Sequence, residues 1–210
     1  MTITIEYVCT GNNGRSPMAE AIAVDYVYRN GLEDRVVISS SGSGLHELTR
    51  PTEEKGKRTR LAIVKMALDN GIFLESWRQD QARLILEQEM NSDESLLDTS
   101  VQYAVNAEAH FRNVALFKVG LLAAGNYHKP TTAKHQGLIL PMAENNAQQV
   151  RRIYEGFSEQ PLVQPINAYV GVEGDVPNPF CQLLPAYLAA RDHLQRVVPM
   201  TIDKAIRELL

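Results

Sequence analysis

The chain has 210 residues, which is enough for one large domain or for one domain that carries a substantial insertion. Its formal net charge of −4 argues against a nucleic-acid-binding protein, because such proteins present basic faces. No apolar stretch reaches the roughly 18 residues of a membrane span, and the first residues lack the pattern of a signal peptide. Since the sequence holds only two cysteines, we expect a cytoplasmic protein with free thiols.

The first part of the chain alternates between strand and helix patterns. Residues 2–8, TITIEYV, alternate apolar and polar side chains and predict a strand that leads into a glycine-rich turn. We predict a helix over residues 17–31, and then a second strand over residues 35–39 that a flexible Ser/Gly run stops. A further helix is predicted over about residues 52–70, where the next glycine ends it.

The last part of the chain returns to this alternation. Residues 137–142, GLILPM, predict a third strand, and residues 144–157 predict the helix that follows it. A weaker fourth strand is predicted within residues 161–170. The last predicted helix begins near Leu183 and continues toward Leu194.

Residues 78–132 interrupt the alternation. They are rich in Glu, Gln, Ala and Leu and predict two or three helices. We therefore predict an α/β fold, in which a central parallel sheet of about four strands carries helices on both faces and a helical subdomain is inserted. In this division, residues 1–77 and 133–210 form the α/β domain, and residues 78–132 form the insertion.

The turn after the first predicted strand, CTGNNGRS at residues 9–16, has the composition of an anion-binding loop. It lies at the carboxyl end of a strand and before a helix, where parallel sheets bind ligands. Glycines and asparagines allow left-handed backbone conformations, so that successive N–H groups can form a nest around a phosphate. The predicted phosphate-binding residues are those of the whole turn after the cysteine: Thr10, Gly11, Asn12, Asn13, Gly14, Arg15 and Ser16.

Two side chains of this turn predict its chemistry. Arg15 offers a planar fork that can donate two parallel hydrogen bonds to phosphate oxygens. The thiolate of Cys9 is favoured by the same positive surroundings, and it would be a nucleophile aimed at phosphorus. The turn therefore predicts phosphoryl transfer through a phosphocysteine, and Cys9 as a small buried residue at a strand end is the alternative. The patterns of nucleotide and dinucleotide loops are absent.

The segment CTGNNGRSPMAEA resembles the active-site signature of the low-molecular-weight protein tyrosine phosphatases. The resemblance implies that Cys9 is the nucleophile and Arg15 the clamp of the transition state. It also implies that Asn12 holds the shape of the loop and that Ser16 donates its hydroxyl to the thiolate. Weaker similarities follow in the same order at residues 40–43, 65–74 and 137–153, and the first of them adds Ser40 as a support of the loop.

The chain departs from the family at the general acid, the group that protonates the leaving oxygen. The family carries an aspartate in an Asp-Pro-aromatic loop, and GDVPNPF at residues 174–180 is similar to that loop but has Asn178 in place of the acid. An amide cannot donate this proton. Either Asp175, three residues earlier, takes the role, or no acid is present and only esters with good leaving groups react.

The resemblance also implies the walls of the pocket, and here too alternatives stay open. Alignment places His46 at one wall, and Asn178 and Phe180 at the other, although His46 can equally be an ordinary surface residue. An active phosphatase would act on a phosphorylated protein or a small phosphate ester, with no nucleic acid, membrane or cofactor involved. The five histidines show no metal-ligand spacing, so we predict no metal site. The alternative is a phosphatase-like module that binds phosphate or a phosphorylated partner, because Asn178 has impaired turnover.

Overall fold

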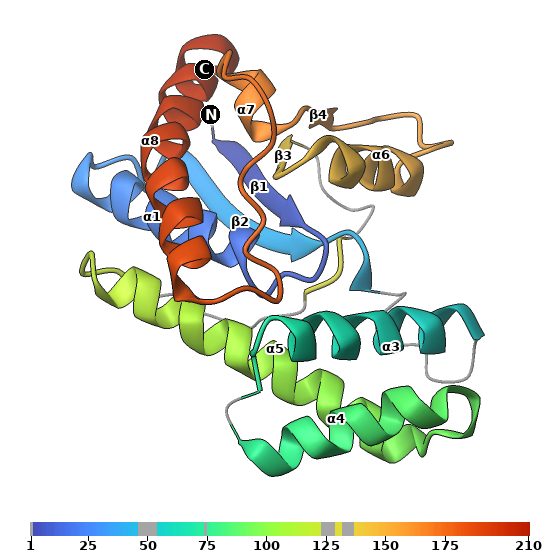
Figure 1. The fold of residues 1–210 in the computed structure, drawn as a ribbon. Helices are drawn as coiled ribbons and strands as arrows, with labels where there is room; N and C mark the ends of the chain where they lie inside the picture. Colours follow the sequence, from blue (N-terminus) through green and yellow to red (C-terminus); the bar gives the residue numbers. More distant parts are fainter. Residues whose placement is uncertain (1, 46–53, 74, 123–128, 132–136) are drawn as a thin grey trace.

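The computed structural model describes the chain except for residues 1, 46–53, 74, 123–128 and 132–136. Its centre is a four-stranded sheet with the order β2-β1-β3-β4, in which every neighbouring pair is parallel (Figure 1). This confirms the predicted α/β fold and its parallel sheet. The strands are β1 (Ile3–Cys9), β2 (Val36–Gly42), β3 (Leu138–Pro141) and β4 (Leu162–Val163).

The alternation of side chains along β1 explains why helices cover both faces of the sheet. Ile5 and Tyr7 point to one face and are buried in the main core, which also includes side chains of the helices α1 and α8. Val8 points to the other face and packs with Val150 of α6. The helices of these layers are α1 (Arg15–Arg29), α6 (Glu144–Ile153), the short α7 (Ile166–Tyr169) and α8 (Leu184–Leu209).

Three further helices form a layer beyond the carboxyl ends of the strands (Figure 1). They have a core of their own, in which Ile63 and Val64 from the first helix meet Ile85 and Leu97 from the other two. The third of these helices lies within the predicted insertion, the second begins two residues before it, and the first packs onto both from the preceding sequence. They are α3 (Glu54–Asp69), α4 (Ser76–Gln88) and α5 (Glu94–Phe117), with a 3-10 turn at Glu89–Asn91.

Two elements differ from the expectation. The Ser/Gly run does not stop the second strand, because residues 39–42 continue to pair with residues 6–9 of β1 and are held by that ladder. The last helix extends beyond the predicted stretch toward Leu194, continues to Leu209 and passes Pro199. Burial of Val197, Val198 and Ile202 against the main core offsets the backbone hydrogen bond that a proline inside a helix removes. None of the helices in the described residues combines the length and the apolar composition that crossing a bilayer requires.

Candidate active site

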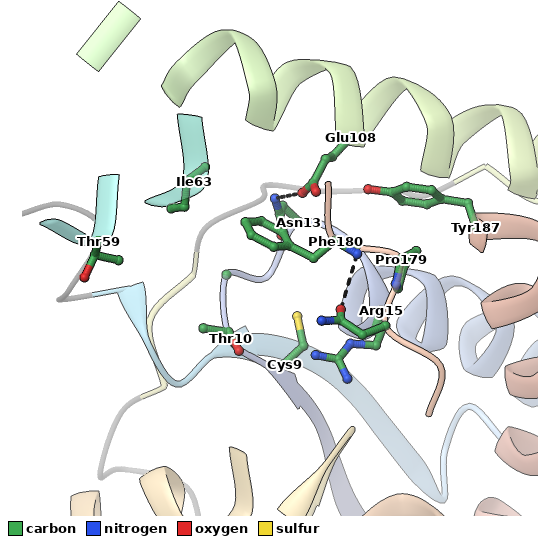
Figure 2. A pocket seen from close by; sticks show the side chains of 13 residues that line it. Cys9, Thr10, Asn13, Arg15, Thr59, Ile63, Glu108, Pro179, Phe180 and Tyr187 are labelled. Atoms are coloured by element: carbon green, nitrogen blue, oxygen red, sulfur yellow. Dashed lines mark hydrogen bonds between the residues drawn. The ribbon is translucent and has the colours of Figure 1, made fainter. Parts of the chain in front are cut away.

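The predicted anion loop connects the end of β1 to the start of α1 and lines a cavity of about 170 Å³. Cys9 and Arg15 lie together on one side of this cavity, and α5 crosses the opposite side (Figure 2). The cavity is smaller than the roughly 300 to 1,000 Å³ of pockets for drug-sized ligands. It is lined by Cys9, Thr10, Gly11, Asn13, Gly14, Arg15, Thr59, Ile63, Glu108, Asn178, Pro179, Phe180 and Tyr187.

The buried side chain of Asn12 holds the loop in shape. Its Nδ2 donates hydrogen bonds to Ser16 Oγ at 3.0 Å and to Ser40 Oγ at 2.9 Å, and its Oδ1 accepts one from the Lys129 backbone N–H at 3.0 Å. Asn12 itself has φ +48°, in the left-handed region. The glycines and asparagines of the turn were both expected to allow such a conformation; Asn12 adopts it, whereas Gly14 lies at φ −127°. The side-chain hydrogen bonds of Asn12 stabilise the turn in this conformation.

Cys9 and Ser16 are joined by a contact of 3.1 Å between sulfur and Oγ, and both are buried. Ser16 Oγ also donates to the Ser41 carbonyl oxygen at 3.1 Å. A hydroxyl has one proton to donate, so it can point to the sulfur or to that carbonyl. When Cys9 is a thiolate, the hydroxyl gains by turning toward the sulfur, because a bond to a charged acceptor is the stronger one.

The end of β2 and the two residues after it hold the backbone of the loop in place. The Ser43 N–H donates to the Cys9 carbonyl at 2.9 Å, and the Gly44 N–H donates to the Thr10 carbonyl at 3.0 Å. A Cβ added to Gly42 would lie 2.8 Å from the Thr10 carbonyl oxygen, so only glycine permits this close approach. Within the described part of the chain, the N–H groups of residues 11–15 donate no hydrogen bond to another residue. These donors are therefore left for an anionic ligand.

Arg15 brings positive charge to the cavity. Its side chain is buried, and its Nη1 donates to the Val176 carbonyl at 3.4 Å. Burial lowers the pKa of the guanidinium, while the negative charges of Cys9, Asp175 and Glu108 oppose that shift. A buried cation of this kind is favourable for binding an anion, since less water has to be displaced.

Two of the predicted wall residues line the cavity, whereas the predicted acid Asp175 does not. Asn178 and Phe180 line the cavity. Asn178 Oδ1 accepts from the Phe180 N–H at 3.3 Å. Asp175 is exposed and is not among the lining residues; its Oδ1 accepts from the Glu144 N–H, at the start of α6, at 3.1 Å. His46 lies outside the described residues.

Several lining residues were not predicted from the sequence. Thr59 and Ile63 come from α3, and Tyr187 comes from the first turn of α8. Glu108 comes from α5, inside the segment that the sequence separates from the sheet. A single glutamate within a helical pattern carries no local signal for such a place. Among the described residues, no group of three His, Cys, Asp or Glu side chains is arranged to hold a metal ion.

Replacing Asn12 by alanine is expected to lower the free energy of unfolding by about 1 to 3 kcal/mol. Three hydrogen bonds are lost, and alanine tolerates the left-handed conformation poorly. The same change should weaken the binding of inorganic phosphate, because the loop N–H groups lose their fixed arrangement. Urea unfolding and calorimetric titration measure the two effects. Asn106→Ala, on the exposed side of α5, is the control, and equal behaviour of both variants would contradict the role given to Asn12.

The part of the chain that contains this loop is similar in sequence to known phosphatases. The model of the family described as low molecular weight phosphotyrosine protein phosphatase matches residues 4–90. The low molecular weight protein-tyrosine-phosphatase YfkJ of Bacillus subtilis (strain 168) is 42% identical over 52 residues, which are 25% of this chain and 33% of that protein. The chain thus aligns with about a third of the length of this curated relative.

Solved structures extend the likeness to the whole fold. A YwlE mutant from Bacillus subtilis superposes with a TM-score of 0.60 at 20% identity, covering 99% of this chain and 100% of that one. A protein tyrosine phosphatase from Entamoeba histolytica, with Hepes in its active site, has a TM-score of 0.61 at 14% identity and full coverage of both chains (100% and 100%). At such identities the likeness concerns the fold.

Proposed function

Because the chain belongs to the low-molecular-weight protein tyrosine phosphatase family, we propose that it hydrolyses phosphate monoesters through a phosphocysteine intermediate on Cys9. The observation that carries this proposal is the buried sulfur of Cys9, 3.1 Å from Ser16 Oγ, in a cavity that it shares with Arg15. A loop that only bound phosphate would not require a sulfur atom there. The substrate is a phosphorylated protein or a small phosphate ester.

The first step is the binding of the phosphate dianion. The free N–H groups of residues 11–15 and the guanidinium of Arg15 would hold its non-bridging oxygens. This places phosphorus above the Cys9 sulfur. Because the donors are fixed before the substrate arrives, little reorganisation is needed as charge develops in the transition state.

The chemistry then follows in two displacements. The Cys9 sulfur forms a bond to phosphorus while the bond to the leaving oxygen breaks, and a proton is delivered to that oxygen. Water next attacks the phosphocysteine, and the sulfur–phosphorus bond breaks to release inorganic phosphate and the thiolate. Ser16 stabilises the thiolate before it attacks phosphorus and again after the phosphocysteine is hydrolysed. The proton of the first step comes from Asp175, from water or from another group of the cavity.

The lining of the cavity favours aryl phosphates as substrates. Ile63, Pro179 and Phe180 present apolar surface beside the phosphate loop. Phe180 can stack on an aromatic leaving group, which supports a phosphotyrosine-like side chain or a small aryl ester. Asn178 supports the other candidate function, a module that binds a phosphorylated partner with little or no turnover.

Steady-state hydrolysis of para-nitrophenyl phosphate between pH 4 and 8 distinguishes the two functions. A phosphatase releases nitrophenol and inorganic phosphate in equal amounts over many turnovers. A binding module binds phosphate or vanadate, as measured by calorimetry, but releases neither product. The second result would overturn the proposed enzyme.

A further inference from the structure

The side chain of Glu108 reaches the catalytic cavity from α5, far from the phosphate loop in sequence (Figure 2). Only 1% of this residue is exposed to solvent. Its Oε2 accepts a hydrogen bond of 2.7 Å from Asn13 Nδ2 of the loop, and its Oε1 accepts one from the Cys181 N–H. The carboxyl group is thus fixed between the phosphate loop and the segment that carries Asn178.

Among the described residues that line the cavity, Glu108 is the only carboxylic acid. Asn178, which stands where the acid is expected, can form no acidic proton. Asp175 is exposed, lies outside the lining and accepts the backbone N–H of Glu144. The reaction needs a proton at the leaving oxygen, and Glu108 is the acid that the cavity holds.

The surroundings of Glu108 allow it to hold a proton near neutral pH. Burial raises the pKa of Glu108 to about 7, although the hydrogen bonds from Cys181 and Asn13 oppose the shift. The hydroxyl of Tyr187 is turned toward the carboxyl group (Figure 2), but it lies outside normal hydrogen-bond geometry. The titratable and charged groups around Glu108 are Arg112 on its own helix, Arg15 and Cys9 at the phosphate loop, and Cys181 and Tyr187 on the C-terminal segment.

We propose that Glu108 is the general acid and base of this cavity. Its carboxyl proton passes to the leaving oxygen as the phosphorus–oxygen bond breaks. Its carboxylate then takes a proton from the water that attacks the phosphocysteine, and the carboxyl group is restored. The inference rests on the proposed phosphatase function, and it assigns the proton transfers of that reaction to the helical layer.

A bound phosphate should itself prepare Glu108 for this role. Two negative groups close together in a buried site disfavour each other's ionisation. When the dianion enters the cavity near neutral pH, it therefore favours the protonated form of Glu108, and the complex takes up a proton. Glu108 therefore carries its proton in the complex that reacts.

The variants Glu108→Gln and Asp175→Asn test the assignment on two esters. Phenyl phosphate has a poor leaving group, whereas para-nitrophenyl phosphate has a good one. Glu108→Gln should lower kcat/KM for phenyl phosphate by about 10² to 10⁴-fold, and that for the nitrophenyl ester by less than about tenfold. The wild-type kcat/KM should fall above about pH 7, where Glu108 loses its proton, and this basic limb should disappear in Glu108→Gln. Asp175→Asn should leave the difference between the two esters and the basic limb as they are in the wild type.

Other outcomes have distinct meanings. Equal losses on both esters in Glu108→Gln, with an unchanged pH profile, would overturn the proton-transfer role and leave Glu108 as a structural residue. A loss confined to phenyl phosphate in Asp175→Asn would assign the acid to Asp175 and overturn the inference. Absence of Cys9-dependent turnover of either ester in the wild-type protein would overturn the proposed function, and the inference with it.

A second measurement applies if Glu108→Gln does not fold. Infrared difference spectra of the wild-type protein, taken at pH 8 with and without inorganic phosphate, detect a protonated carboxyl group. Since Glu108 is mostly ionised at this pH in the free protein, the inference predicts that a buried carboxyl band appears when phosphate binds. No new band in the wild-type protein would overturn the inference. Asn178→Asp provides the gain-of-function control, because an acid at the family position should relieve the dependence on Glu108.

Discussion

Replacing Cys9 by serine is expected to lower the turnover of para-nitrophenyl phosphate by at least about 10⁴-fold. Serine keeps the shape of the loop and the contact with Ser16, but its hydroxyl is a far weaker nucleophile than a thiolate. A phosphoserine, once formed, also releases its phosphate slowly. Binding of inorganic phosphate should persist, because the donors of residues 11–15 and Arg15 are unchanged. Steady-state assays and calorimetry separate the two effects.

The second cysteine provides a matched control for this experiment. Cys181 is buried in the core of the helical layer, and burial raises the pKa of its thiol. It would thus be a poor nucleophile at neutral pH, and Cys181→Ser should keep most of the turnover. Retention of more than about a hundredth of the wild-type turnover by Cys9→Ser would contradict the nucleophilic role of Cys9.

Replacing Arg15 by lysine is expected to lower kcat by about 10² to 10⁴-fold, although the charge is kept. The guanidinium can donate two parallel hydrogen bonds to the phosphoryl oxygens, and an ammonium group cannot reproduce that planar arrangement. The side chain is also buried and donates a hydrogen bond to the Val176 carbonyl, so the ammonium group of lysine would lie at a different position from the guanidinium. Because the bonds strengthen in the transition state, the loss should appear in kcat as well as in KM.

Arg29→Lys, at the other end of α1, serves as the control for this change. Arg29 is exposed and pairs with Asp25, so its replacement should leave kcat and KM unchanged. If Arg15→Lys were as active as Arg29→Lys, a point charge alone would be sufficient in the cavity. The planar clamp that we assign to Arg15 would then be wrong.

The sheet could be predicted, and the candidate phosphate loop could be located, because their signals are local. The sequence has a strand pattern that ends at Cys9, then a turn, and then Arg15. This order predicts that the turn lies at the carboxyl end of β1. The second strand was predicted too short, since the Ser/Gly run has low strand propensity by itself and is held by its pairing with β1. Such pairing is a tertiary effect that no short window of sequence contains.

The approach of α5 to the cavity could not be predicted for the same reason. Glu108 and Asn13 are 95 positions apart, and only the packing of α5 against α8 and α3 brings them together. From the sequence alone, Glu108 is one glutamate among many on a helix. The missing acid at Asn178 was visible, but the sequence offered Asp175 as its replacement because that residue is near in the chain. Nearness in the cavity favours Glu108 instead.

The central claim of a phosphocysteine is tested most directly by rapid acid quenching of the wild-type protein with a radiolabelled aryl phosphate. We expect a burst of aryl alcohol close to one equivalent of protein, with the label recovered on the peptide that contains Cys9. The peptide that contains Cys181 serves as the internal control and should carry none. Multiple turnovers without any labelled protein, or a label on a residue other than Cys9, would contradict the account.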